Sequence, residues 1–145
     1  MPRDTRESGS CPPRSAVTSA PSGSTPTSSA APFQGAPYNQ AIAVGDLVFT
    51  AGQLGLKPGD SAVEGDITQQ TEQALANVQA VLEAAGSSME NLVKTSVFLV
   101  DLDDFQAMNA VYATRVGDRP PARSTFQVAK LPSGALVEIE AIAHL

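Results

Sequence analysis

Hydrophobic and polar positions alternate in short runs that predict the first β-strands of the chain. One run covers residues 38–44, and its partner covers residues 47–54. Gly45 and Asp46, between the two runs, are residue types of a two-residue hairpin turn. Gly52 lies inside the second run, where a glycine marks a bulge or the close approach of another group to the backbone.

Residues 62–65 are predicted to form a brief edge strand, and a helix follows. Asp66 caps this helix in an approximate capping box with Gln69, and Gly86 ends it as a left-handed cap. Helical spacing places on one apolar face Ile67, Thr71, Ala74, Leu75, Val78, Leu82 and Ala85. The polar residues predicted to lie mainly outside this stripe are Gln70, Gln73, Asn77 and Glu83.

Residues 93–100 are rich in β-branched and aromatic side chains and predict a strand. A second helix is predicted to open at Asp103, with Gln106 three residues later, and to end at Gly117. Its apolar stripe consists of Phe105, Met108, Val111, Tyr112 and Val116.

Residues 120–143 are predicted to form a closing hairpin with its turn at residues 131–134. Val137, Ile139, Ala141 and Ala143 point one way on the return strand, and Glu138, Glu140 and Ile142 the other. Arg123 stands at the start of the hairpin, and Glu138 and Glu140 lie on its return strand, so a guanidinium and a carboxylate could face one small space. Such a space suits a small carboxylate substrate and proton chemistry beside it.

The element order β-β-(β)-α-β-α-β-β predicts an α+β fold, a two-layer sandwich with both helices on one face of a mixed sheet. Apolar side chains occur on both sides of the strands: Leu47 and Phe49 oppose Val48, and Phe98 opposes Val97. Strands covered on one side only do not show this pattern. Either the sheet curls on itself or it packs against copies of itself, and in so small a domain we expect the second: an obligate homo-oligomer with the reactive groups near the contact between copies.

Composition separates the first 32 residues from the rest of the chain. They hold eight Ser, four Thr and six Pro, and we predict that residues 1–32 form a disordered extension while residues 33–145 form the domain. The extension lacks the apolar core of a signal peptide, and no stretch of the chain is long enough to span a membrane.

The body of the domain is acidic, since the whole chain has a net charge of −6. Without a basic stripe it is a poor candidate for binding nucleic acid. The one cysteine, Cys11, lies in the extension, so neither a disulfide framework nor a thiolate metal site is expected. His144 has no Cys or His partners for a metal site. A reducing cytosol suits such a chain.

Several segments, in order, resemble the RidA/YjgF family of reactive enamine/imine deaminases: residues 36–41 (APYNQA), 49–54 (FTAGQL), 93–99 (VKTSVFL), 121–124 (PARS) and 137–143 (VEIEAIA). The resemblance implies a chorismate-mutase-like fold and a homotrimer with active sites in clefts between subunits. It also implies hydrolysis of 2-aminoacrylate and related imines to 2-keto acids and ammonia, with no metal or cofactor.

The resemblance also implies roles for individual residues. Arg123 would bind the substrate carboxylate and Glu138 would hold or activate water. Residues that would line the pocket or donate backbone hydrogen bonds are Tyr38, Gly52, Asn109 and Thr125. The chain departs from the family pattern at Ala36, where Gly is common, and at Thr125, where Cys is frequent.

Other interpretations of these residues remain open at this point. Arg123 is also compatible with a surface ion pair, and Glu140 is as good a candidate as Glu138 from the pattern alone. Tyr38 could pack at a strand end, and Asn109 could be simply exposed. At the level of function, the alternatives are a non-catalytic metabolite sensor or chaperone and, less compatible with the acidic charge, an endoribonuclease or translation inhibitor.

Overall fold

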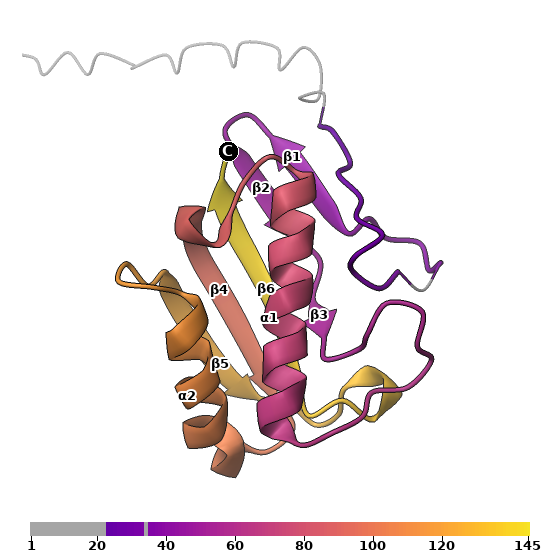
Figure 1. Ribbon diagram of the computed structural model, residues 1–145, viewed down its shortest axis with the longest axis vertical. Coiled ribbons are helices and arrows are strands. Elements are labelled where there is room, and N and C mark those ends of the chain that lie inside the picture. Colours follow the sequence, from indigo (N-terminus) through magenta and orange to yellow (C-terminus); the bar gives the residue numbers. More distant parts are fainter. Residues whose placement is uncertain (1–22, 34) are drawn as a thin grey trace, which may run out of the picture.

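The computed structural model describes residues 23–33 and 35–145. Figure 1 shows two helices lying side by side across one face of a twisted sheet. The helices are α1 (Ile67–Ala84) and α2 (Phe105–Arg115). The strands are β1 (Ala41–Val44), β2 (Leu47–Thr50), β3 (Gln53–Leu54), β4 (Leu92–Leu99), β5 (Ala122–Gln127) and β6 (Val137–His144). Short 3₁₀ turns are η1 (Met89–Asn91), η2 (Leu102–Asp104) and η3 (Pro132–Gly134). The predicted α+β two-layer fold is confirmed.

The sheet has the strand order β1-β2-β6-β4-β5, with β3 pairing with β6 beyond the end of β2. Only the β4–β5 pair is parallel among the strands described. The predicted closing hairpin is therefore wrong, because β5 and β6 do not pair: both flank β4. Helix α2 carries the chain from the end of β4 back to the end where β4 begins, so β5 runs parallel to β4. The other edge of β4 pairs with β6.

The first hairpin and its turn are confirmed, although the first strand begins at Ala41 and not at residue 38. Val44 pairs with Leu47, and Gly45 has a φ of 57°, which glycine adopts without steric cost. The predicted second strand breaks at residues 51 and 52 into β2 and β3, as Gly52 suggested. The predicted edge strand at residues 62–65 is absent, because this stretch lies in an exposed loop with no strand beside it.

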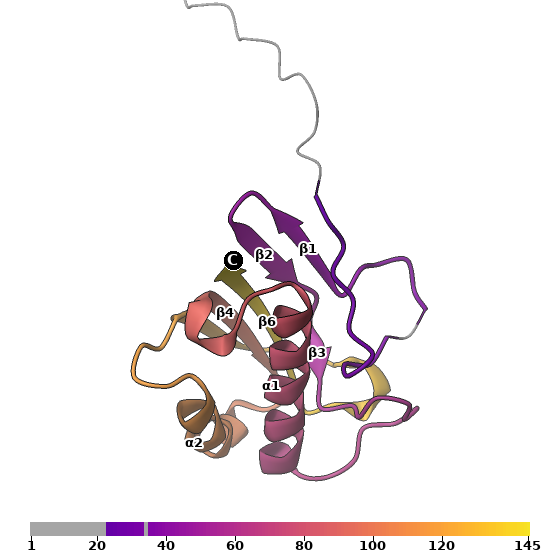
Figure 2. The same cartoon turned by 45° about the horizontal axis from the view of Figure 1, so that its top comes forward.

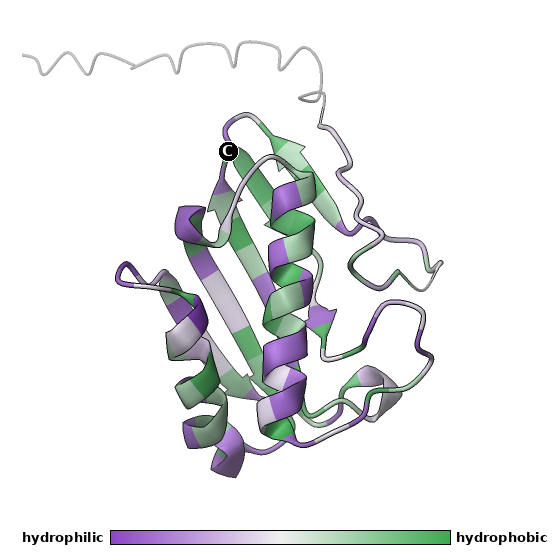
Figure 3. Cartoon of the chain, viewed as in Figure 1, coloured by the Kyte–Doolittle hydropathy of each residue, from purple (hydrophilic) through white to green (hydrophobic). Residues whose placement is uncertain are grey.

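Helix α1 begins with the predicted capping box, in which the Asp66 carboxylate accepts from the Gln69 N–H at 2.9 Å. Figure 3 shows hydrophobic and hydrophilic residues alternating along it. Two polar residues predicted outside the apolar stripe are buried. Gln70 donates to the Gly65 carbonyl and accepts from the Leu136 N–H, and Asn77 donates to one carbonyl at the end of β3 and to one just after it. Both side-chain amides pair with backbone N–H or carbonyl groups of neighbouring irregular segments, which would otherwise lack a hydrogen-bond partner.

The start of the second helix differs from the prediction. Residues 102–104 form η2, and the Asp101 carboxylate accepts from the Asp103 N–H at 2.9 Å. Asp101 therefore caps this turn, and Asp103, which was predicted to open the helix, donates its N–H to that cap. Met108, Val111, Tyr112 and Val116 are buried against α1 and the sheet, as the apolar stripe predicted.

The predicted disorder of the extension does not hold for residues 23–32. Ser24 forms a bridge with Ala43 of β1, and Ala31 belongs to the hydrophobic core. Figures 1 and 2 show this segment running beside β1. The polar composition of this segment gave no sign of its order, because the side chain that holds it, Gln40, lies in the domain. Residues 1–22, with Cys11, lie outside the described residues.

Asn77→Ala is expected to destabilise the fold by about 2–3 kcal/mol, because it leaves two buried carbonyls without a donor. The wild-type Asn77 amide donates to the carbonyls of Leu54 at 2.9 Å and Leu56 at 2.8 Å. Urea unfolding measures the change. Glu83→Ala, on the exposed side of the same helix, is the control and should cost about 0.5 kcal/mol or less. Equal effects of the two substitutions would contradict the assigned role of Asn77.

Candidate functional site

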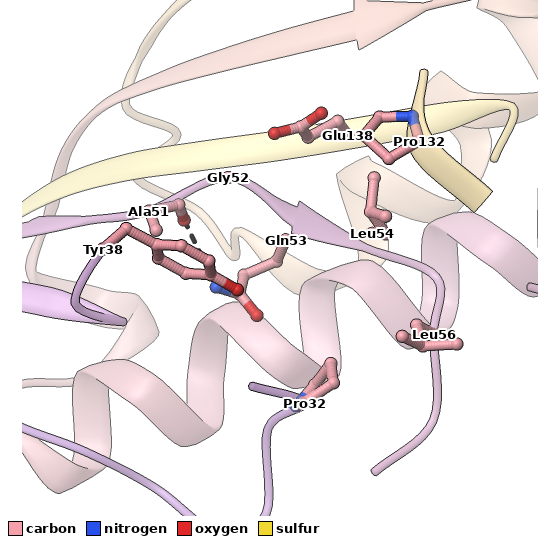
Figure 4. Close-up of a pocket in the computed structure, with 9 residues that line it drawn as sticks. All are labelled: Pro32, Tyr38, Ala51, Gly52, Gln53, Leu54, Leu56, Pro132 and Glu138. Carbon is pink, nitrogen blue, oxygen red and sulfur yellow. Dashed lines mark hydrogen bonds between the residues drawn. The ribbon is translucent and has the colours of Figure 1, made fainter. Parts of the chain in front are cut away.

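A cavity of about 260 Å³ lies where β3 pairs with β6. Figure 4 shows its lining, which comes from segments far apart in the chain: Pro32, Tyr38, Ala51, Gly52, Gln53, Leu54, Leu56, Pro132 and Glu138. Three of the residues predicted for the site, Tyr38, Gly52 and Glu138, thus share one cavity. Its other walls are mostly apolar.

Gly52 lies directly under the Glu138 carboxyl group. A Cβ atom at this position would overlap the Glu138 side chain, so only glycine leaves room for the carboxylate here. The close approach of another group that the isolated glycine predicted is therefore the approach of Glu138. Leu54 pairs with Glu138 and Gln53 with Ile139 in the β3–β6 register, which fixes the carboxylate over the break between β2 and β3.

The environment of Glu138 changes its acidity. Burial raises the pKa of the Glu138 carboxyl group, and repulsion from Glu140 raises it further. A carboxylate with a raised pKa is a better proton acceptor than an ordinary surface carboxylate. The two glutamates, equivalent in the strand pattern, also differ in place: Glu140 is more exposed and faces a depression with Lys94 and Ser96.

Arg123 belongs to a second group of residues, under α2. Its Nη1 donates to Asn109 Oδ1 at 2.8 Å, and its guanidinium carbon lies 4.6 Å from the centre of the Tyr112 ring and 5.5 Å from that of Phe105. The Tyr112 hydroxyl group lies 2.6 Å from Thr95 Oγ1. Two aromatic faces and one amide therefore hold the guanidinium in place.

An open depression of about 410 Å³ borders this arginine group. Its lining includes Asn109, Tyr112, Pro121 and Arg123. Thr125 lies two residues further along β5 and is not part of this lining. Sequence reasoning treated Tyr112 and Phe105 as core only. Phe105, Asn109 and Tyr112 are spaced to lie near one another on one helix, and this was the available signal. It points to Arg123 only once β5 is known to lie next to α2.

Arg123 and Glu138 occupy opposite faces of the sheet. Arg123 is in register with Thr95, and Thr95 with Ala141. Thr95 and Ala141 are buried on the side of the helices. Glu138 is in register with Phe98, and both point to the other side because strand residues alternate. The single small space expected between Arg123 and Glu138 of one hairpin is therefore absent within this chain.

Comparison with known proteins identifies the family. Residues 28–145 match the family model described as Endoribonuclease L-PSP. The chain belongs to this family. The match also begins at residue 28, inside the segment that packs on β1.

Individual members share most of this chain. The mouse 2-iminobutanoate/2-iminopropanoate deaminase is 44% identical over 114 residues, which are 78% of this chain and 84% of that protein. The crystal structure of RidA from an Antarctic Psychrobacter is 39% identical, with a TM-score of 0.81 over 84% of this chain and 99% of that one. Escherichia coli TdcF with bound serine is 37% identical, with a TM-score of 0.80 over 84% and 98%. These matches agree with the resemblance to RidA/YjgF proteins.

The described residues hold neither a cluster of metal ligands nor a membrane-spanning helix. Residues 23–33 and 35–145 contain no group of three or more His, Cys, Asp or Glu side chains placed to hold a metal ion. Within the same ranges, neither helix combines the length and the apolar character needed to cross a bilayer.

Glu138→Gln is expected to stabilise the protein at neutral pH. The folded-state pKa of Glu138 lies above its ordinary value of 4.5, so the folded state disfavours the ionised carboxylate, and stability is lost as the pH rises from the unfolded to the folded pKa. Urea midpoints of the variant should exceed those of the wild type at about pH 7.5 and match them at about pH 3.5. Glu83→Gln, at an exposed position, should show no such pH dependence. A midpoint below that of the wild type at neutral pH would contradict the burial of a charge at Glu138.

Proposed function

We propose that this protein hydrolyses reactive 2-imino acids and their enamine tautomers to 2-keto acids and ammonia. Family membership and the name of the mouse relative support this activity. The observation that carries it is the pair of half-sites on one chain: a carboxyl group with a raised pKa over Gly52, and a guanidinium held rigidly by Asn109 and aromatic rings. The serine in TdcF is similar in size to the proposed substrates.

Arg123 binds the carboxylate of the substrate in this proposal. A guanidinium has five N–H donors in a planar fork that matches a carboxylate. The described contacts use one of them, the bond to Asn109. The stacking of Tyr112 and Phe105 against Arg123 limits its rotation, so little conformational entropy is lost when the substrate binds.

Glu138 carries the protons of the reaction. An enamine first becomes an imine by gaining a proton on carbon and losing one from nitrogen. Glu138 then accepts a proton from water as the water oxygen bonds to the imine carbon, and it passes this proton to the nitrogen. In the last step Glu138 takes the proton of the new hydroxyl group and gives it to the nitrogen as the carbon–nitrogen bond breaks, so that ammonia leaves and the keto acid forms. One imino acid and one water thus yield one keto acid and one ammonia, and the raised pKa of Glu138 favours the step in which it accepts the proton of water.

The two half-sites meet between copies of the chain, and we propose a homotrimer as the assembly. The sheet face away from the helices carries exposed apolar side chains, with Phe49 42% and Phe126 55% exposed. Apolar groups of this size gathered on one face mark an interaction surface. Packing this face against another copy would bring the Glu138 cavity of one protomer toward the Arg123 depression of its neighbour, with Thr125 and the Gly52 backbone beside the substrate.

The binding-only alternative uses the same half-sites. A metabolite sensor would bind 2-keto acids through Arg123 without accelerating hydrolysis, so turnover separates the two functions. Cleavage of RNA fits less well, because a chain with a net charge of −6 repels a phosphate backbone. The cytosol remains our proposed location.

Arg123→Ala is expected to lower kcat/KM for imine hydrolysis by about 10- to 100-fold, the usual value of a charged hydrogen bond. A dehydratase acting on serine supplies 2-aminoacrylate, and the rate of pyruvate formation above the spontaneous rate is measured. Arg123→Lys should recover only part of the loss, since an ammonium cannot form the two parallel hydrogen bonds that a guanidinium makes to a carboxylate. Lys130→Ala, at an exposed position, is the control.

Two outcomes of this assay count against the proposal. A wild-type protein that does not accelerate pyruvate formation would remove the deaminase activity. Full activity of Arg123→Ala would remove the assigned role of the arginine and leave the activity itself standing.

A further inference from the structure

One buried amide binds the backbone of residues 28–32, in the segment that precedes β1. Gln40, only 1% exposed, accepts from the Ser28 N–H at 2.7 Å. Its Nε2 donates to the carbonyls of Ser28 at 3.1 Å, Ala31 at 3.0 Å and Pro32 at 3.3 Å. The amide therefore satisfies backbone groups along residues 28–32 that no strand could satisfy.

This anchored segment, residues 28–32, reaches the Glu138 cavity through one residue. Pro32 lines the cavity, and its carbonyl group is one of those held by Gln40. Phe33, the next residue, packs against Tyr38 with ring centres 5.3 Å apart. Figure 4 shows Pro32 facing the cavity from a different part of the chain than Glu138 and Gly52. The Gln40 amide thus holds Pro32 in its place at the cavity.

The cavity lining combines polar and apolar groups. Glu138, Tyr38 and Gln53 are polar, whereas Pro32, Leu54, Leu56 and Pro132 are apolar. No Lys or Arg lines the cavity in the part of the chain that the structure describes. An acidic substrate side chain would therefore meet Glu138 without a compensating cation, and an apolar side chain would fit toward the proline wall.

We propose that Gln40 is a positioning residue that fixes Pro32 as the far wall of the substrate cavity, so that residues 28–32 select 2-imino acids with short apolar side chains. This inference rests on the proposed function, because it assigns the cavity to the side chain of the imine. The segment before β1, which composition alone predicted to be disordered, thereby gains a role in substrate selectivity.

The test compares imines with short and long side chains. An amino acid oxidase generates the imines of 2-aminobutyrate and leucine in place, and kcat/KM is measured for each with the wild type, Pro32→Ala and Gln40→Leu. Pro32→Ala should raise the leucine-to-aminobutyrate ratio of kcat/KM by about tenfold, the usual effect of a few methylene groups in a pocket. Gln40→Leu should change the ratio in the same direction. Pro26→Ala, just before the anchored segment and outside the cavity lining, is the matched control.

A ratio is the informative quantity, because general loss of folded protein lowers both rates equally. An unchanged ratio in Pro32→Ala would overturn the proposal, and so would an equal change in Pro26→Ala. The binding constants of 2-oxobutanoate and 4-methyl-2-oxopentanoate are measured in parallel. If the wild type binds these keto acids without turning over the imines, the deaminase function is wrong, and a smaller difference between the two binding constants in Pro32→Ala still supports the role of Pro32. If the wild type shows no turnover and no binding, both the deaminase function and the role of Pro32 are overturned.

Discussion

The alternation of side chains along a strand is the constraint on which this site depends. It places Arg123 with Thr95 on the side of the helices and Glu138 with Phe98 on the other side. Strand β4 also lies between β5 and β6. No rotamer change within one chain brings the two groups together, so a reaction that uses both needs two copies. The apolar residues on the outer face, Phe49 and Phe126, supply a physical reason for such an assembly.

Buried amides organise the parts of the domain that regular secondary structure does not. Gln40 holds the segment before β1, Asn77 holds the segment after β3, and Gln70 reaches the backbone at Leu136 near η3. All three are almost fully buried, and each reaches a segment that carries a lining residue of the Glu138 cavity or lies close to one. Their hydrogen bonds replace the missing ladder bonds of irregular backbone. The shape of the cavity therefore depends on side-chain amides as much as on the sheet.

Much of the fold could be predicted from local signals. The Gly45 turn, the Asp66 capping box and the apolar stripe of α1 are properties of short stretches, and the structure contains all of them. Strand pairing is not local. Residues 120–143 show two good strands and a turn, but only the α2 crossover decides that β5 joins β4 in parallel. The predicted hairpin failed for that reason.

The candidate site was predictable in part, for the same physical reason. Gly52 signalled a close approach from the sequence alone, and Glu138 is the group that approaches. The preference for Glu138 over Glu140 came from the resemblance, because an alternating pattern treats them alike. Pro32 was missed because polar, proline-rich composition predicts disorder, and a single distant glutamine reverses that prediction. Tyr112 and Phe105 were missed because their contact with Arg123 exists only after β5 and α2 are packed together.

Mixing two inactive variants tests the shared site most directly. Arg123→Ala and Glu138→Gln are each prepared, unfolded together in equal amounts, refolded and assayed for imine hydrolysis. A site built from two copies is restored wherever an intact arginine half meets an intact glutamate half, so the mixture should recover about one quarter of wild-type activity in a cyclic assembly. A mixture as inactive as its components, although the subunits have exchanged, would show that one chain supplies both groups and would contradict the account.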